Sequence, residues 1–258
     1  MTDRRFLKSS VLEKILHEAW DHSQNGRPLL VVFDLDSTLF DLTGRVTKII
    51  DRFRQIEAVR FPEECRRLND IQILQTDWGL KTPLERLGLP CEGPFFAALH
   101  QHWADAFFSN EYLIYDKPLP GAVTFVQKLH EFGAHIMYLT GRDIPRMGDG
   151  TYKSLLNNQF PIDSPTVQLV LKPHPKMDDA AFKAEVLRDF ERKYKRIWFF
   201  ENEPVNLNLV ARECPNIKLV FVETAHSGRE EPSPFWERIT HFEIDIETLP
   251  LKQATGDN

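Results

Sequence analysis

Short, largely apolar runs alternate along the chain with segments whose apolar residues recur every three or four positions. The runs cover residues 29–33, 134–139, 167–171, 196–200 and 217–222, and each has the length of a strand buried on both faces. Helical spacing separates them, for example over 120–133 and 181–190. Because strands and helices alternate, the pattern predicts an α/β fold in which a parallel sheet is flanked by helices on both faces.

One long segment, residues 41–116, interrupts this alternation. It has apolar stripes at helical spacing over 46–56 and 95–107, with Pro and Gly residues between them. We therefore expect an inserted helical domain over 41–116 and a core formed by 1–40 and 117–258. The aromatic residues of the insert are expected to form its own small core, with Trp78, Phe95, Phe96 and Trp103 as the main members.

The basic residues of the insert, Arg45 among them, are outnumbered by its acidic residues. This balance predicts a solvated surface rather than a phosphate-binding patch. An amphipathic helix over 11–20 is expected to pack on the core domain.

Polar and charged residues stand where the predicted strands end. Asp34 and Asp36 follow the first strand, and the ends of the next three strands carry Thr140-Gly141-Arg142, Lys172 and Glu201. In parallel sheets, ligands bind outside the carboxyl ends of the strands. Asp34 and Asp36 would share a strand face, but we expect the chain to turn the second carboxylate away as it leaves the strand. The two carboxylates could then have different roles.

The sequence Asp34-Leu35-Asp36-Ser37-Thr38 resembles the first motif of the haloacid dehalogenase superfamily, whose phosphatases carry Asp-x-Asp-x-Thr/Val at the end of the first strand. The resemblance implies a Rossmann-like core with strand order 5-4-1-2-3 and a C1 helical cap over 41–116. It implies that Asp34 is the nucleophile that forms an aspartyl-phosphate and that Asp36 is the general acid and base. Mg²⁺ would sit on the Asp34 carboxylate and the Asp36 backbone carbonyl.

The second and third motifs of the family also have counterparts. The resemblance implies that Thr140 offers its hydroxyl and N–H to phosphoryl oxygens, that Gly141 allows close approach, and that Arg142 contacts phosphate or pins the loop. The third motif needs a lysine, for which Lys183 and Lys172 are both candidates. Lys183 is favoured by its position on a helix, and Lys172 is kept as a substrate-binding candidate.

The fourth motif is an acidic cluster that completes the Mg²⁺ shell, and here it departs from the common aspartate form. Glu201 replaces a shorter acid, and Asn202 stands where a second carboxylate is often found. Glu201 could coordinate Mg²⁺ directly or through water, and both options stay open. Glu203 and Asn206 are weaker candidates, and His226 is expected to be a loop histidine.

The composition limits the classes of partner that the protein is expected to bind. The 258-residue chain has a net charge of -6, so the excess of Lys and Arg that a nucleic-acid groove requires is missing. No run approaches the about 18 apolar residues of a membrane span, and the N-terminal residues lack a signal-peptide pattern. The three cysteines have no metal-ligand spacing, which favours a reduced, cytoplasmic protein. A small phosphorylated ligand needs only local positive charge. The sequence indicates no oligomeric state.

Taken with the resemblance, these features predict a Mg²⁺-dependent phosphatase, a phosphoric monoester hydrolase acting on a small phosphomonoester. Haloacid dehalogenases proper use the first Asp without a second acid, so Asp36 favours a phosphatase. A phosphotransferase or phosphomutase could use the same residues. A non-catalytic binding or regulatory module on the same fold is the other alternative, suggested by the unusual Glu201-Asn202-Glu203 cluster.

Overall fold

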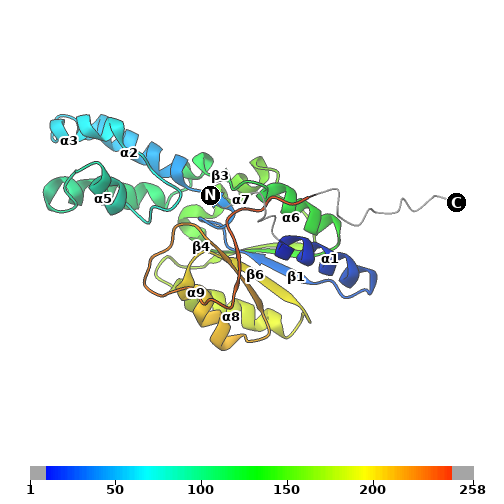
Figure 1. The fold of residues 1–258 in the computed structure, drawn as a ribbon. Helices are drawn as coiled ribbons and strands as arrows, with labels where there is room; N and C mark the ends of the chain where they lie inside the picture. Colours follow the sequence, from blue (N-terminus) through cyan, green and yellow to red (C-terminus); the bar gives the residue numbers. More distant parts are fainter. Residues whose placement is uncertain (1–9, 246–258) are drawn as a thin grey trace.

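Six parallel strands form the central sheet of the protein in a computed structural model that describes residues 10–245 (Figure 1). The strands are β1 (Leu30–Phe33), β4 (His135–Asp143), β5 (Val167–Lys172), β6 (Ile197–Glu201), β7 (Lys218–Val222) and β8 (Glu237–Ile239). Their order is β5-β4-β1-β6-β7-β8. This arrangement confirms the predicted Rossmann-like sheet and places the first strand in its interior.

The sixth strand, β8, was not predicted. It pairs in parallel with β7 at the edge of the sheet. Two of its three residues, Glu237 and Arg238, are exposed and only Ile239 is buried. An edge strand this short has no apolar run, and its presence depends on pairing with β7 rather than on a local pattern.

Helices cover both faces of the sheet. On one face lie α1 (Ser10–Gln24) and α6 (Ala122–Glu131), and on the other lie α8 (Asp179–Glu191) and α9 (Pro204–Glu213) (Figure 1). Strand β1 is buried on both faces: Val31 and Phe33 pack into the first apolar layer and Leu30 and Val32 into the second. Helix α7 (Ile144–Asn157) follows β4.

A second body of helices, which we call the helical lobe (residues 43–115), projects from the sheet domain (Figure 1). Its helices are α2 (Thr43–Glu57), α3 (Pro62–Arg67), α4 (Lys81–Arg86) and α5 (Gly93–Phe107), with short 3₁₀ helices η2 (Leu68–Asp70) and η3 (Glu111–Tyr115). The lobe has its own apolar core, which includes Phe53, Phe95 and Leu99. The two connecting segments pair as short antiparallel strands, β2 (Phe40–Asp41) and β3 (Lys117–Pro118).

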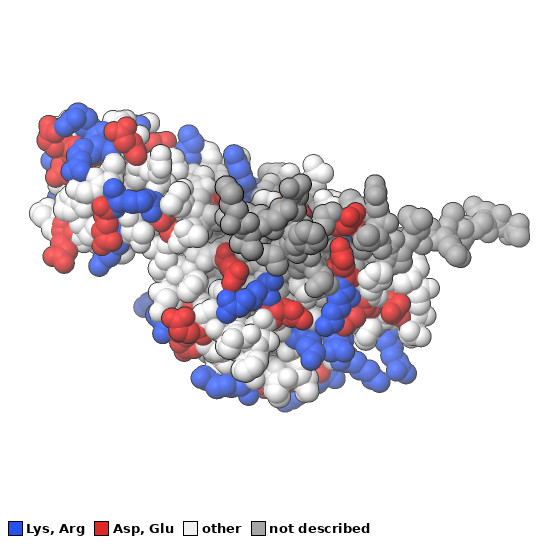
Figure 2. All heavy atoms as spheres, in the orientation of Figure 1, with Lys and Arg blue, Asp and Glu red and all other residues white. Residues whose placement is uncertain are grey.

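On the face of the helical lobe drawn in Figure 2, Lys and Arg side chains are interspersed with Asp and Glu. Within residues 10–245, no helix combines the length and the apolar character needed to cross a membrane.

The packing of the C-terminal segment on the sheet domain can be tested at Gly121. Its φ is 76°, and a Cβ atom there would overlap the backbone of Phe242 and Glu243. Gly26 also has positive φ, 62°, but a Cβ there has open space around it. Both Ala variants carry a left-handed backbone cost of about 1–2 kcal/mol. Gly121→Ala should lower the free energy of unfolding by clearly more than Gly26→Ala in urea denaturation. Equal losses would contradict this packing.

Candidate active site

The register of the sheet brings two carboxylates together at its carboxyl edge. In the parallel pair β1 and β6, Phe33 is opposite Phe200, and the N–H of Asp34 donates to the Phe200 carbonyl at 3.0 Å. Asp34 and Glu201 therefore leave neighbouring strands at the same level. Both are almost fully buried, with exposures of 4% and 1%.

Lys183 lies between these two carboxylates. Its Nζ donates to Oδ1 of Asp34 at 2.6 Å and to Oε2 of Glu201 at 2.7 Å. The lysine is itself buried, and its neighbours on α8, Phe182 and Ala184, pack in the apolar layer beneath the sheet. The helix thus carries the ammonium group through an apolar layer to the end of β1. One cation is shared by two buried anions.

The shared contact shifts the pKa values of Asp34 and Lys183. Burial, with the neighbouring Glu201 carboxylate, raises the pKa of Asp34 to about 7, although Lys183 acts in the opposite direction. Burial alone would lower the pKa of Lys183, but the two carboxylates raise it above its usual range. The trio carries one surplus negative charge.

Asp36 faces different partners because the chain turns after it. Ser37 has a φ of 60°, a left-handed conformation that few residues other than glycine adopt. The Asp36 carboxylate accepts from Arg142 at 2.6 and 3.1 Å and from Arg45 at 2.7 Å. Burial acts to raise the pKa of Asp36, but the two guanidinium groups hold it well below its usual range. The two aspartates thus have separate surroundings.

Arg45 and Asp116 were missed by the sequence analysis, which placed Arg45 on a solvated surface. Arg45, on α2 of the helical lobe, is fully buried. Its Nε donates to Asp116 at 2.7 Å, and Arg142 also donates to Asp116, at 2.9 Å. Asp116 lies in the segment that returns from the lobe. Arg45 lies one and two turns before Ile49 and Phe53 on the buried face of α2, so the helical spacing did carry a signal of its burial, although its partners are distant in sequence.

The other predicted residues lie around these two groups. The Thr140 hydroxyl accepts from the N–H of Arg142 at 3.2 Å, and Gly141 lines the same cavity as Asp34. Lys172 instead donates to Asp179 at 2.5 Å and to the Met177 carbonyl at 3.0 Å. The structure therefore brings Lys183, and not Lys172, to Asp34.

In the strand-end cluster after β6, the acceptor positions are largely occupied. Glu201 Oε1 accepts from the N–H groups of Asn202 and Glu203, and its Oε2 accepts from Asn206 as well as Lys183. The side chain of Asn202 accepts from Thr38 at 3.0 Å. Glu203 accepts from Ser227. The ring of His226 lies near Phe221.

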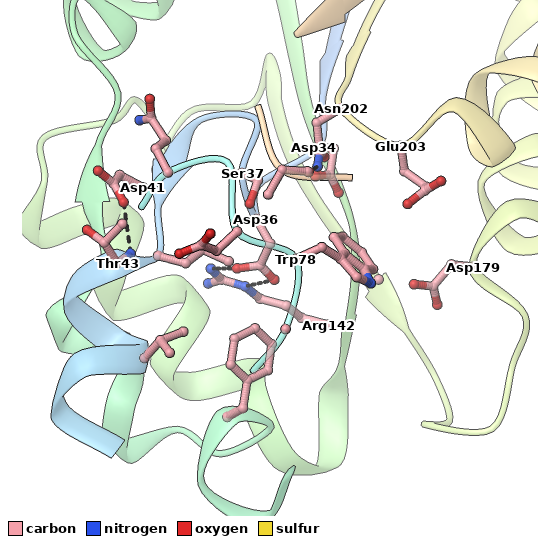
Figure 3. A pocket seen from close by; sticks show the side chains of 18 of the residues that line it. Asp34, Asp36, Ser37, Asp41, Thr43, Trp78, Arg142, Asp179, Asn202 and Glu203 are labelled. Carbon is pink, nitrogen blue, oxygen red and sulfur yellow. Dashed lines mark hydrogen bonds and ion pairs between the residues drawn. The ribbon is translucent and has the colours of Figure 1, made fainter. Parts of the chain in front are cut away.

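A cavity of about 330 Å³ opens over these groups, between the sheet edge and the helical lobe. Figure 3 shows Asp34, Asp36 and Arg142 in its wall with Asp179 and Glu203 nearby. Among residues 10–245, the Asp34 side chain accepts a hydrogen bond through Oδ1 alone, from Lys183. Oδ2 is the carboxylate atom at the end of β1 that is left for a ligand.

These donors fit a largely hydrated magnesium ion. Among the described residues, no three His, Cys, Asp or Glu side chains are arranged to hold a metal. Mg²⁺, however, keeps several waters and binds proteins through one or two carboxylates. The free oxygen of Asp34 and the surplus negative charge meet that requirement. Because each Glu201 oxygen already accepts two hydrogen bonds, contact between Glu201 and the ion, direct or through water, would require one of these bonds to be given up.

The fold and the site together define an α/β protein with a carboxylate–lysine centre at the carboxyl edge of its sheet, next to a helical insert. A family model described as haloacid dehalogenase-like hydrolase matches residues 29–207, which is more than half of the chain. The chain belongs to this hydrolase family, as the resemblance of its motifs predicted.

Solved structures with a similar fold include a haloacid dehalogenase superfamily hydrolase of subfamily IA from Geobacter sulfurreducens, with 14% identity and a TM-score of 0.51 over 83% of this chain and 92% of that chain. A predicted phosphoglycolate phosphatase from Haemophilus somnus has 13% identity and a TM-score of 0.49, covering 83% and 94%. A predicted phosphatase from Clostridium acetobutylicum has 16% identity and a TM-score of 0.43, covering 75% and 84%. These likenesses concern the fold. No curated protein gives a significant match.

The charge surplus at Asp34 predicts a pH-dependent stability in excess chelator. A carboxyl whose pKa rises from its usual value near 4 to about 7 on folding stabilises the protein fully below about pH 4, and this contribution is lost as pH rises through 7. Asn is neutral throughout, so Asp34→Asn should raise Tm relative to the parent by about 5 °C at pH 8 and by little at pH 4. Asp149→Asn, at an exposed position, is the control and should show no such trend. A constant difference across this range would refute the surplus-charge account.

Proposed function

We propose that the protein is a Mg²⁺-dependent phosphatase that hydrolyses a small phosphomonoester through an aspartyl-phosphate on Asp34. The observation that carries the proposal is the buried Asp34–Lys183 contact of 2.6 Å at the wall of the cavity, which leaves the second Asp34 oxygen without a donor among residues 10–245. A carboxylate nucleophile must approach a phosphate dianion, so cations have to offset the repulsion. Lys183 is fixed where it can do so.

The metal site proposed here uses Oδ2 of Asp34 and the backbone carbonyl of Asp36, with the negative charge of Glu201 nearby. When bound, Mg²⁺ would supply the positive charge that keeps Asp34 ionised beside Glu201 and would offset the charge of the phosphate. Thr140 and the Gly141 backbone are proposed to contact phosphoryl oxygens. Arg142, which is occupied by Asp36 and Asp116, is proposed to pin the loop.

Asp36 is proposed as the general acid and base. Its ion pairs with Arg45 and Arg142 favour the carboxylate form, which is the form that accepts a proton from the water attacking the aspartyl-phosphate. Donation of a proton to the leaving oxygen is less favourable, because the same ion pairs disfavour the protonated form of Asp36. Leaving groups that need little protonation should therefore react faster in the first step.

The helical lobe is proposed to act as the family's C1 cap, which covers the cavity and excludes water during transfer. The same residues would serve a phosphotransferase or phosphomutase if the lobe admitted an acceptor alcohol instead of water. The experiment below separates these activities from a non-catalytic module.

The phosphoenzyme is the most direct test. Mixing the protein and Mg²⁺ with an activated aryl phosphate should place phosphate on Asp34, seen by mass spectrometry as an acid-stable, hydroxylamine-sensitive adduct. Asp34→Asn should form none. Asp36→Asn should form it but hydrolyse it about 10²–10⁴-fold more slowly, because water is no longer activated, so the adduct accumulates. Phosphate on another residue, or full turnover in excess chelator, would overturn the mechanism, and an inert protein would favour the binding module.

The two lysines provide a matched pair for the charge argument. Lys183→Ala should reduce kcat by at least about 10²-fold, since it removes a preorganised cation from the phosphoryl group. Lys172→Ala removes the contact with Asp179 and should reduce kcat much less. Circular dichroism should show both variants folded. The reverse ranking would mean that Lys172 has the catalytic role.

A further inference from the structure

The helical lobe contributes four aromatic side chains to the cavity wall, Trp78, Trp103, Phe107 and Phe108. At the end of α5 the rings pack on each other: the centroids of Trp103 and Phe107 are 4.8 Å apart, and those of Phe107 and Phe108 are 5.1 Å apart. This cluster gives the cavity that Asp34 lines an apolar, packed section of wall.

Trp78 differs from the other three. It was expected in the core of the insert, but half of it is exposed, at 50%, and within residues 10–245 its indole packs against no other aromatic ring. Figure 3 shows the indole projecting into the cavity. An aromatic ring with a free face at a cavity is available to stack on a ligand.

The loop that carries Trp78 is held in place. The Asp77 carboxylate accepts from the N–H of Leu74 at 2.7 Å and from Arg86 at 2.7 and 2.8 Å. On the other side, the Gln75 carbonyl accepts from the N–H of Ala225, in the sheet domain, at 3.2 Å. The loop therefore joins the lobe to the sheet domain beside the cavity, and Trp78 is positioned rather than loose.

The cations that line the cavity are mostly paired with carboxylates. Lys183 contacts Asp34 and Glu201, and Arg142 contacts Asp36 and Asp116. The third, Arg229, is exposed, and its Nε donates to the Ser227 hydroxyl. Asp77 and Asp179 in the wall are ion-paired with Arg86 and Lys172, whereas Asp41 and Glu203 form no ion pair among residues 10–245 and disfavour a carboxylate or a second phosphate nearby.

We propose that this site takes phosphomonoesters whose leaving group is an uncharged, apolar alcohol, preferably one with an aromatic ring, and that Trp78 is the residue that stacks on it. The inference rests on the proposed phosphatase function. A ring attached to a phosphate suits a cavity of about 330 Å³. Phosphorylated acids, by contrast, would place a second charge against aromatic rings.

The test compares three alkyl phosphates, so that leaving-group chemistry is similar: benzyl phosphate, glycerol 3-phosphate and 2-phosphoglycolate. With Mg²⁺, kcat/KM for benzyl phosphate should exceed the others by about 10- to 100-fold, the effect of burying one ring. Trp78→Ala should remove most of this preference by lowering kcat/KM for benzyl phosphate far more than for glycerol 3-phosphate, and Trp78→Phe should retain it. Phe235→Ala, which alters an exposed aromatic residue outside this cavity, should leave the preference unchanged.

Equal or better turnover of glycerol 3-phosphate or 2-phosphoglycolate would overturn the inference and leave the phosphatase function standing. So would an equal effect of Trp78→Ala on all three substrates. If no phosphate ester is hydrolysed, the proposed function fails, and calorimetry with benzylphosphonate and phosphonoacetate still decides the inference. Tighter binding of benzylphosphonate that depends on Trp78 would support it, and equal binding would overturn it.

Discussion

The structure depends on one constraint: carboxylates at the carboxyl edge of a buried sheet need cations within contact distance. The ammonium of Lys183 satisfies Asp34 and Glu201 at once. An uncompensated buried charge would cost several kcal/mol, so α8 must approach the end of β1 at this height. The same requirement fixes the pairing of β1 with β6, since a slip in register would separate the two anions that share the lysine. The charge balance and the sheet register support each other.

A second ionic group joins the helical lobe to the sheet domain. Asp36 and Arg142 come from the sheet domain, Arg45 from α2, and Asp116 from the chain returning from the lobe. Each guanidinium contacts both carboxylates, so the group is neutral and leaves Asp36 ionised. Both connections between lobe and sheet domain thus meet at a carboxylate of the candidate site. Any displacement of the lobe that moves α2 changes the charge next to Asp36.

The sequence predicted what depends on local pattern. Continuous apolar runs located five of the six strands, β5 at one edge of the sheet included, and the motif order located Asp34 and Lys183 at strand and helix positions that the fold brings together. Features that depend on residues distant in sequence were not predicted. Arg45 shares the buried face of α2 with Ile49 and Phe53, but its partners Asp36 and Asp116 do not follow from that spacing. Strand β8 has one buried residue and exists through pairing with β7. Trp78 is an aromatic residue of the kind usually found in a core, but its exposure depends on how its loop packs on the sheet domain.

The length of the Glu201 side chain has a physical consequence at the strand end. It lets one oxygen accept the N–H groups of the next two residues, Asn202 and Glu203, while the other holds Lys183 and Asn206. The carboxylate thus stabilises the turn into α9 and the lysine, and has no acceptor position left. What remains for a cation is one oxygen of Asp34, backbone carbonyl groups and water. A cation bound there would keep most of its hydration, so its affinity would depend on the surplus charge of the trio more than on the number of protein ligands.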